Sequence, residues 1–272
     1  MNITKLYPGG RPKAFNVSYD DGVLQDTRFV ALLNKYGLKG TFNLNSGLMR
    51  REFTWTHESG LCVTRLSESA AKNLYTGHEV ASHTLTHPYM DSLSRADILI
   101  QLETDRMNLE HLFGREILGF AVPFLYYSEE IASCARQTGF AYARISEITG
   151  DYSVPTDPFY WRGSKFHWDD DLEAFIDGFL ATGEELALCQ LVGHSYDLDV
   201  LNLWERMDTI LARIAACPDV APMTNLELVR YTAAMSQAEI HEDRIANPTP
   251  LDLWFRAGER VLVLHPGEAK IL

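Results

Sequence analysis

The 272-residue sequence lacks the features of several common protein classes. Its four cysteines are scattered and form no Cys-x-x-Cys pair, so neither a thiolate zinc site nor a disulfide scaffold is expected. No glycine-rich fingerprint follows the first predicted strand and no P-loop motif occurs, so nothing favours a nucleotide-binding sheet. The longest apolar run, about 11 residues from Leu186 to Tyr196, is too short to span a bilayer.

Basic residues are also scarce. The chain has 24 Lys and Arg against 37 Asp and Glu, a net charge of −13, which disfavours nucleic acid and anionic membrane as partners. The apolar fraction of 46% is ordinary for a globular protein. Without a signal-peptide pattern, we expect a cytoplasmic protein. A small-molecule or oligosaccharide substrate fits these properties, and self-association stays open.

Strand-like and helix-like segments alternate along most of the chain. Strands are predicted at residues 14–19, 40–44, 79–83, 117–122, 141–145 and 186–192. This alternation indicates parallel β/α units, either closed as a barrel or open as a doubly wound sheet.

The last part of the chain has a different pattern. Two short apolar runs, at 251–255 and 261–264, are separated by Ala257-Gly258-Glu259, which predicts a β-hairpin. We therefore predict a catalytic domain over residues 1–235 and a hairpin extension over residues 236–272. The hairpin either packs on the main domain or mediates self-association.

Polar residues gather where predicted strands end, which is where parallel β/α proteins carry their functional side chains. The pair Asp20-Asp21 precedes Gly22, and His83 and His87 are four residues apart. Alone, the first is an ordinary Asp-Gly turn, and the second is either a pair of metal ligands or two surface histidines. Together, one carboxylate and two histidines offer three metal ligands and leave an open position, as in a catalytic metal site.

Two further strand ends add to this pattern. His194 follows the most apolar strand and is either a general acid or a hydrogen-bonded core histidine. Phe124 follows Pro123 at another strand end, which alone indicates only a turn. With a spare carboxylate and a spare histidine, the set suits hydrolysis of an amide or ester by water activated on a metal.

The order and spacing of these motifs resemble the NodB-homology polysaccharide deacetylases, carbohydrate esterase family 4. The family's motifs correspond here to Ser18-Tyr19-Asp20-Asp21-Gly22, His83-Thr84-Leu85-Thr86-His87-Pro88, Ala121-Val122-Pro123-Phe124 and Leu191-Val192-Gly193-His194. The fourth motif, an acid followed by Trp, is at best echoed by His167-Trp168-Asp169. The resemblance covers about residues 10–235 and implies an α/β fold, a distorted (β/α) barrel of about seven strands, here with a short C-terminal β extension.

The resemblance also implies roles for individual residues. Asp21, His83 and His87 would bind one divalent metal, most often zinc and sometimes cobalt or nickel. Asp20 would be the general base and His194 the acid that protonates the leaving amine. The backbone N–H of Phe124 would stabilise the oxyanion.

One departure from the family pattern affects the base. Ala121 replaces the arginine that pairs with the catalytic aspartate in the family, and without a cation the pKa of Asp20 is expected to rise. Arg144 and Arg162 are two candidates to supply that cation, although either could be an ordinary salt-bridged arginine.

The resemblance leaves the substrate open. Five aromatic residues near the motifs could stack on a sugar ring or could simply pack in the core: Tyr19, Tyr126, Trp161, Trp168 and Tyr196. The leading hypothesis is a metal-dependent deacetylase of an N-acetylated sugar or oligosaccharide, with Trp168 and Tyr196 contacting the substrate. The alternatives are a hydrolase of another small amide on the same barrel, or a carbohydrate-binding member with impaired catalysis.

Overall fold

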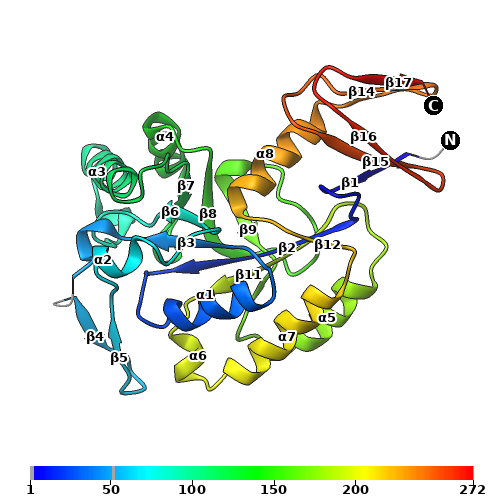
Figure 1. Cartoon of the computed structure of the whole chain (residues 1–272). Helices are drawn as coiled ribbons and strands as arrows, with labels where there is room; N and C mark the ends of the chain where they lie inside the picture. The colour runs from blue at the N-terminus through cyan, green and yellow to red at the C-terminus, as the bar shows by residue number, and fades with distance from the viewer. Residues whose placement is uncertain (1–2, 51–52, 272) are drawn as a thin grey trace.

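The computed structural model describes residues 3–50 and 53–271, and its main body is a barrel of parallel strands surrounded by helices (Figure 1). In hydrogen-bonded order the barrel strands are β2 (Lys13–Asp20), β3 (Gly40–Leu44), β6 (Glu79–Ser82), β7 (Gly119–Ala121), β8 (Tyr142–Ile148), the interrupted strand β9 (Trp161–Gly163) and β10 (Lys165–Phe166), and β11 (Ala187–Gly193).

The barrel is closed because β11 pairs with β2, and β9 and β10 join β8 to β11. Counting β9 and β10 as one strand gives seven barrel positions, which confirms the expected barrel. A short strand, β12 (Val220–Pro222), also pairs with the first residues of β2.

Helices cover the outside of the barrel. They are α1 (Asp26–Lys35), α2 (Glu68–Ala71), α3 (Arg95–Phe113), α4 (Glu129–Thr138), α5 (Leu172–Ala181), α6 (Asp197–Val200), α7 (Trp204–Ala216) and α8 (Asn225–Ser236), with 3-10 turns at Ser46–Leu48, Met90–Ser92 and Pro158–Tyr160. The side chain of Ser94 caps α3 and that of Ser128 caps α4. The apolar faces of α1 to α7 form the main hydrophobic core against the outer face of the barrel, whereas α8 packs in a second cluster with strands of the C-terminal extension.

The interior of the barrel is polar. Asn225, the first residue of α8, is fully buried and donates its side-chain amide to Ser18 Oγ at 3.2 Å. Ser18 Oγ also accepts from Asn43 Nδ2 at 3.0 Å, and Asn43 in turn donates to Asp20 at 2.7 Å. Buried polar groups need such partners, and this chain of bonds connects the beginning of α8 to the end of β2.

The C-terminal extension is larger than the predicted hairpin. The hairpin itself is present as β15 (Leu253–Ala257) and β16 (Arg260–Leu264), but β1 (Ile3–Leu6) adds a third strand alongside β15. A second small sheet contains β13 (Glu239–Ile240), β14 (Arg244–Ala246) and β17 (Ala269–Ile271). The expectation of a lone hairpin was therefore wrong, because the additional strands have only two to four residues, too few for a readable periodicity.

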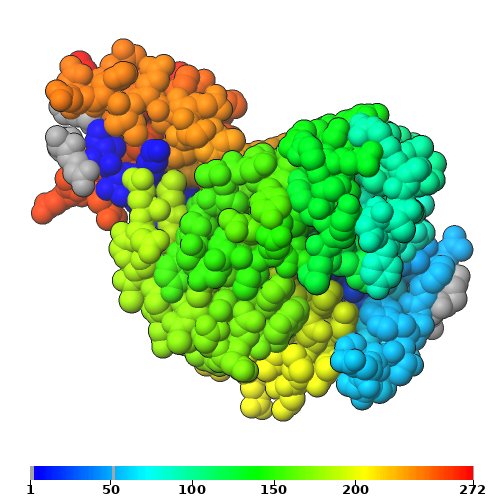
Figure 2. Space-filling model, turned by 180° about the vertical axis from the view of Figure 1, so that it is seen from behind, coloured from blue at the N-terminus to red at the C-terminus, as the bar shows by residue number. Residues whose placement is uncertain are grey.

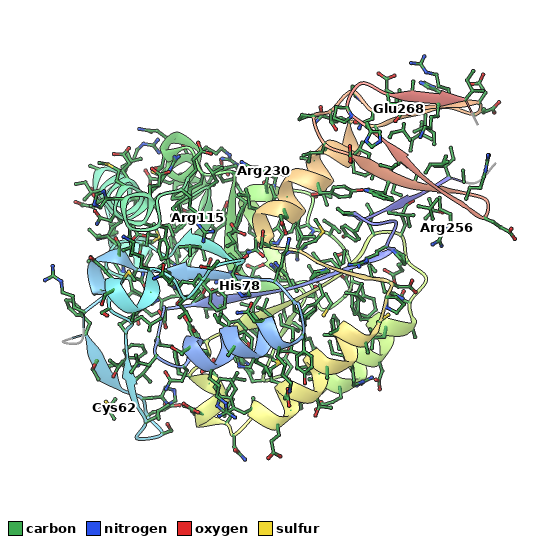
Figure 3. The ribbon with its side chains drawn as sticks, in the orientation of Figure 1. Cys62, His78, Arg115, Arg230, Arg256 and Glu268 are labelled. Atoms are coloured by element: carbon green, nitrogen blue, oxygen red, sulfur yellow. The ribbon has the colours of Figure 1, made fainter. Side chains whose placement is uncertain are left out.

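The extension stands out from the barrel as a separate lobe in the space-filling view (Figure 2). Figure 3 marks Arg256 and Glu268 on this lobe, far from the barrel strands. Because β1 belongs to it, the N-terminal and C-terminal parts of the chain are side by side (Figure 1). A division of the chain near residue 235 stays a prediction, now with β1 assigned to the extension.

A second hairpin, not predicted, projects from the opposite end of the barrel. It consists of β4 (Thr54–Thr56) and β5 (Cys62–Thr64), and Cys62 lies well out along it in Figure 3. All four cysteines are free, and the sequence predicted no disulfide scaffold. Within residues 3–50 and 53–271, no helix combines the length and apolar character needed to cross a membrane.

Candidate active site

The predicted site residues come together at the C-terminal ends of the barrel strands. Asp20 ends β2, and His83 and His194 directly follow β6 and β11. A pocket of about 300 Å³ opens there, lined by Asp20, Asp21, His83, His87, Phe124, Leu125, Arg144, Ser146, Phe166, Trp168, Val192, Gly193, His194 and Tyr196. All eight residues predicted for catalysis, metal binding or substrate contact line this one pocket.

Three of these side chains could hold a metal ion. One ligand atom each from Asp21, His83 and His87 lies within 4.8 Å of the others, and His87 Nε2 is 3.7 Å from Asp21 Oδ1. His83 Nδ1 donates to the carbonyl oxygen of Ala121 at 2.9 Å, so its Nε2 is the free ligand atom. A histidine whose second nitrogen is fixed by a carbonyl is the usual arrangement of a metal ligand.

The protonation states of the three side chains also suit a metal. Burial lowers the pKa of His83 to about 4, and burial likewise lowers the pKa of His87. Burial alone would raise the pKa of Asp21, but the nearby Arg65 and histidines hold it below its usual value. Asp21 Oδ1 is buried and accepts no hydrogen bond from the described residues. A carboxylate and two neutral imidazoles are a suitable donor set for zinc or a similar divalent metal.

Backbone strain is concentrated at this pocket. Among the described residues, six other than glycine have positive φ, and four of them are in the loops that form the site: Asp21, Thr84, His87 and Phe124. Such conformations persist only where the surrounding structure enforces them. At Phe124, where φ is 58°, Ser146 Oγ donates to the carbonyl oxygen and so fixes the orientation of the loop.

Asp20 and His194 lie beside the three candidate ligands. Asp20 Oδ2 is 3.9 Å from His83 Nε2, and His194 Nε2 is 3.9 Å from Asp21 Oδ2. His194 Nδ1 donates to Asp197 Oδ2 at 2.9 Å, which leaves its Nε2 facing the pocket. The pocket therefore presents a carboxylate and an imidazole to a group bound at the cluster, as general acid–base chemistry requires.

The comparison with protein families identifies the chain. Residues 9–143 match the polysaccharide deacetylase family, and this segment contains the Asp20-Asp21 pair and both histidines of the cluster. The chain belongs to the polysaccharide deacetylase family. The resemblance found in the motifs is thereby confirmed, whereas no curated protein sequence matches the chain.

Solved structures of related proteins, one of them a pseudoenzyme, share the fold. A putative polysaccharide deacetylase from Mycobacterium smegmatis is 14% identical, with a TM-score of 0.59 over 86% of this chain and 94% of that one. A mutant of the peptidoglycan deacetylase PdaC from Bacillus subtilis is 14% identical, with a TM-score of 0.53 over 85% and 97%. A pseudoenzyme of carbohydrate esterase family 4 from Bacillus anthracis is 17% identical, with a TM-score of 0.50 over 83% and 68%. At these identities the likeness establishes the fold alone.

In this family member the cation absent at Ala121 comes from the next strand. Ala121 on β7 is paired in register with Arg144 on β8, and the buried guanidinium of Arg144 forms an ion pair with Asp20 Oδ1. Burial would raise the pKa of Asp20, but Arg144, followed by His83 and His194, lowers it. Arg162, the other candidate, instead lies over the ring of Tyr160 at 5.8 Å. The rise in pKa expected from the loss at Ala121 is therefore not found.

Replacing Arg144 with Ala should lower turnover roughly 10- to 100-fold, because Asp20 loses the group that orients it. Adding Ala121→Arg to this variant should recover part of the loss, since it places a guanidinium on the neighbouring strand in register. Arg162→Ala is the matched control and should leave turnover near that of the original protein. The steady-state kinetics of the four proteins test this, and equal rates for the original and Arg144→Ala proteins would refute the role of Arg144.

The carboxylate expected from the fourth motif is not supplied by His167-Trp168-Asp169. Asp169 accepts from the backbone N–H of Phe166 and lies 3.6 Å from Lys165 Nζ, whereas the carboxylate that contacts His194 belongs to Asp197. Burial would lower the pKa of His194, but the hydrogen bond that His194 donates to Asp197 and the charges of the nearby carboxylates raise it to about 9. The spacing His194-x-x-Asp197 was a readable signal for this pair.

Replacing Asp197 with Asn should move the alkaline limb of the pH–rate profile to lower pH. A general acid works only when protonated, and the loss of the Asp197 charge lowers the pKa of His194, by on the order of one unit. Asp199→Asn is the control, because Asp199 bonds Gln25 and Trp204 rather than His194. An unshifted alkaline limb in the Asp197 variant would show that this carboxylate does not set the titration of the acid.

The aromatic candidates divide into two groups. Trp168 and Tyr196 line the pocket, and the His194 ring stacks on Tyr196 at 4.8 Å. Tyr19 and Trp161 are buried: Tyr19 stacks on Phe29, and Trp161 donates its indole N–H to Gln190. The first group is positioned to contact a substrate, and the second belongs to the core. Tyr126, the fifth candidate, is exposed and is not among the residues that line the pocket.

Arg65 is a site residue that the sequence did not reveal. It follows β5, is buried, and its guanidinium lies 3.1 Å from Asp21 Oδ1 while also donating to the Asp21 carbonyl and to Asn45. No motif or spacing marks this residue, because its loop reaches Asp21 only through the folded path of the β4–β5 hairpin. Arg65 fixes both the backbone and the carboxylate of Asp21.

Proposed function

We propose that this protein is a metal-dependent hydrolase that removes acetyl groups from an N-acetylated sugar or a soluble oligosaccharide. The observation that carries the proposal is the convergence of Asp21, His83 and His87 in one pocket, with Asp20 and His194 beside them. Family membership supports the reaction class. The bound metal, with zinc as first choice and cobalt or nickel as alternatives, supplies a Lewis acid that polarises the acetyl carbonyl and makes water more acidic.

The chain's own residues perform the proton transfers. Arg144 and Asn43 hold Asp20 Oδ1, so Oδ2 is left to accept a proton from the attacking water. The backbone N–H of Phe124 stabilises the negative charge that develops on the carbonyl oxygen. His194, protonated and held through Nδ1 by Asp197, donates a proton from Nε2 to the leaving amine. Acetate then departs.

The pocket agrees with a small substrate unit. A volume of about 300 Å³ is at the small end of ligand pockets and suits a single ring with its acetyl group rather than a buried polymer. Impaired catalysis was an alternative because the motif arginine is missing, and the Arg144–Asp20 pair removes that reason. The cytoplasmic location and any self-association stay predictions.

Acetate release tests the function. The zinc-loaded protein is incubated with N-acetylglucosamine, with its β-1,4-linked oligomers, and with a panel of small cyclic and linear amides. We expect acetate and a free amine from the sugars, and loss of the reaction after chelation. Hydrolysis of the other amides alone would favour the second hypothesis, and no hydrolysis by zinc-, cobalt- and nickel-loaded protein would favour a binding role.

A further inference from the structure

An exposed aromatic pair lies at the mouth of the pocket. The rings of Tyr89 and Phe124 stack with centroids 3.9 Å apart and planes 8° from parallel. Tyr89 is 64% exposed, although large apolar side chains usually remain exposed in groups only where they bind something. Leu125, which also lines the pocket, is 82% exposed beside them.

The pair is attached to the catalytic groups. Phe124 also packs edge-on against the ring of His87, with centroids 4.5 Å apart, so the rings of His87, Phe124 and Tyr89 form a continuous series leading out of the pocket. Phe124 follows β7 and Tyr89 follows His87 and Pro88 after β6. Ser92 donates its backbone N–H and its Oγ to the Tyr89 carbonyl, and Ser146 fixes that of Phe124. The platform is therefore held in place before any ligand arrives.

We propose that the Tyr89–Phe124 stack binds a second sugar ring, adjacent to the one whose acetyl group enters the pocket. The inference rests on the proposed function. The Tyr89 ring stacks on Phe124 and the residue is still largely exposed. A flat aromatic face complements the apolar C–H face of a pyranose ring. The pocket of about 300 Å³ has room for one ring, so a second ring of an oligosaccharide must lie outside it. Neither Tyr89, Phe124 nor Leu125 carries a charge, which suits a neutral sugar.

The substrate class is thereby narrowed to oligosaccharides of two or more rings. The test uses Asp20→Asn protein, so that binding is measured without turnover, and titrates it calorimetrically with N-acetylglucosamine and its β-1,4-linked dimer and trimer. The dimer and trimer should bind more tightly than the single sugar. Tyr89→Ala in the same background should reduce that advantage roughly 3- to 10-fold, the value of one aromatic stacking contact.

Tyr89→Phe is the matched control, because it keeps the ring and should keep the advantage. The proposal is overturned if the Tyr89→Ala protein keeps the whole preference for the dimer and trimer over the single sugar. It is also overturned if the parent protein shows no such preference. If Tyr89 instead mediates contact between two copies, Tyr89→Ala will change the sedimentation of the protein but not its preference for the longer oligomers. That result also overturns the proposal. Acetate release by protein with Asp20 intact is measured separately, so a length effect without acetate release would refute the proposed function and leave the platform standing.

Discussion

Replacing Asp20 with Asn is expected to lower kcat by about 10²- to 10⁴-fold, the usual contribution of a general base. Asp20 is the only acid at the pocket that Arg144 and Asn43 both hold, and it lies outside the cluster of candidate metal ligands. The amide has nearly the same shape but cannot accept the proton from water. Metal content should therefore stay near one ion per chain while turnover falls.

Asp169→Asn is the control for this experiment. Asp169 belongs to the echoed fourth motif but bonds the backbone of Phe166 and faces Lys165. Its replacement should leave kcat within about twofold of the original value, because it is absent from the proton path. Circular dichroism and thermal melting establish that both variants fold. Equal rates for the Asp20 variant and the original protein would remove Asp20 as the base.

Replacing His83 or His87 with Ala should weaken zinc binding by at least roughly 100-fold. Loss of a group that only orients a metal ligand lowers metal affinity 10- to 100-fold, so loss of the ligand itself should lower the affinity more. The binding constant is measured by competition with a chromogenic chelator, which reports metal affinity independently of catalysis. Activity should fall in parallel, and high zinc concentrations should restore part of it.

His265→Ala provides the matched control for the histidine variants. His265 is an exposed histidine on the C-terminal extension that faces Asp252, far from the pocket residues. Its replacement should leave both the affinity and the stoichiometry as they are. Unchanged zinc affinity in the His83 and His87 variants would place the metal elsewhere or show that none binds.

Much of the barrel could be predicted from the sequence. The six predicted strands all occur, because apolar runs of five to seven residues are readable as buried parallel strands. The seventh was implied only by the family resemblance, since β9 and β10 have three and two residues on either side of Ser164. The pairing of β1 with β15 was out of reach, because it joins the two ends of the chain and depends on the tertiary fold.

The sequence could predict which motif residues form the site, but not which side chains contact one another there. The motif residues lie at strand ends, where chain order alone brings them to one face of a barrel. The partner of Asp20 was narrowed to Arg144 or Arg162, and only the register of β8 against β7 decides between them. Arg65 acts through a contact made by a loop, whose path follows from packing rather than from a periodic pattern. Asp197, three residues after His194, was within reach of the sequence but was not predicted.

The most direct test of the metal centre is a crystal structure of the protein with zinc added, using anomalous scattering at the zinc edge. We expect one strong peak in contact with the Asp21 carboxylate and with the Nε2 atoms of His83 and His87. Asp20 and His194 should flank the peak without binding it. A peak bound by other residues, or no peak at this cluster in zinc-saturated crystals, would contradict the metal-dependent mechanism.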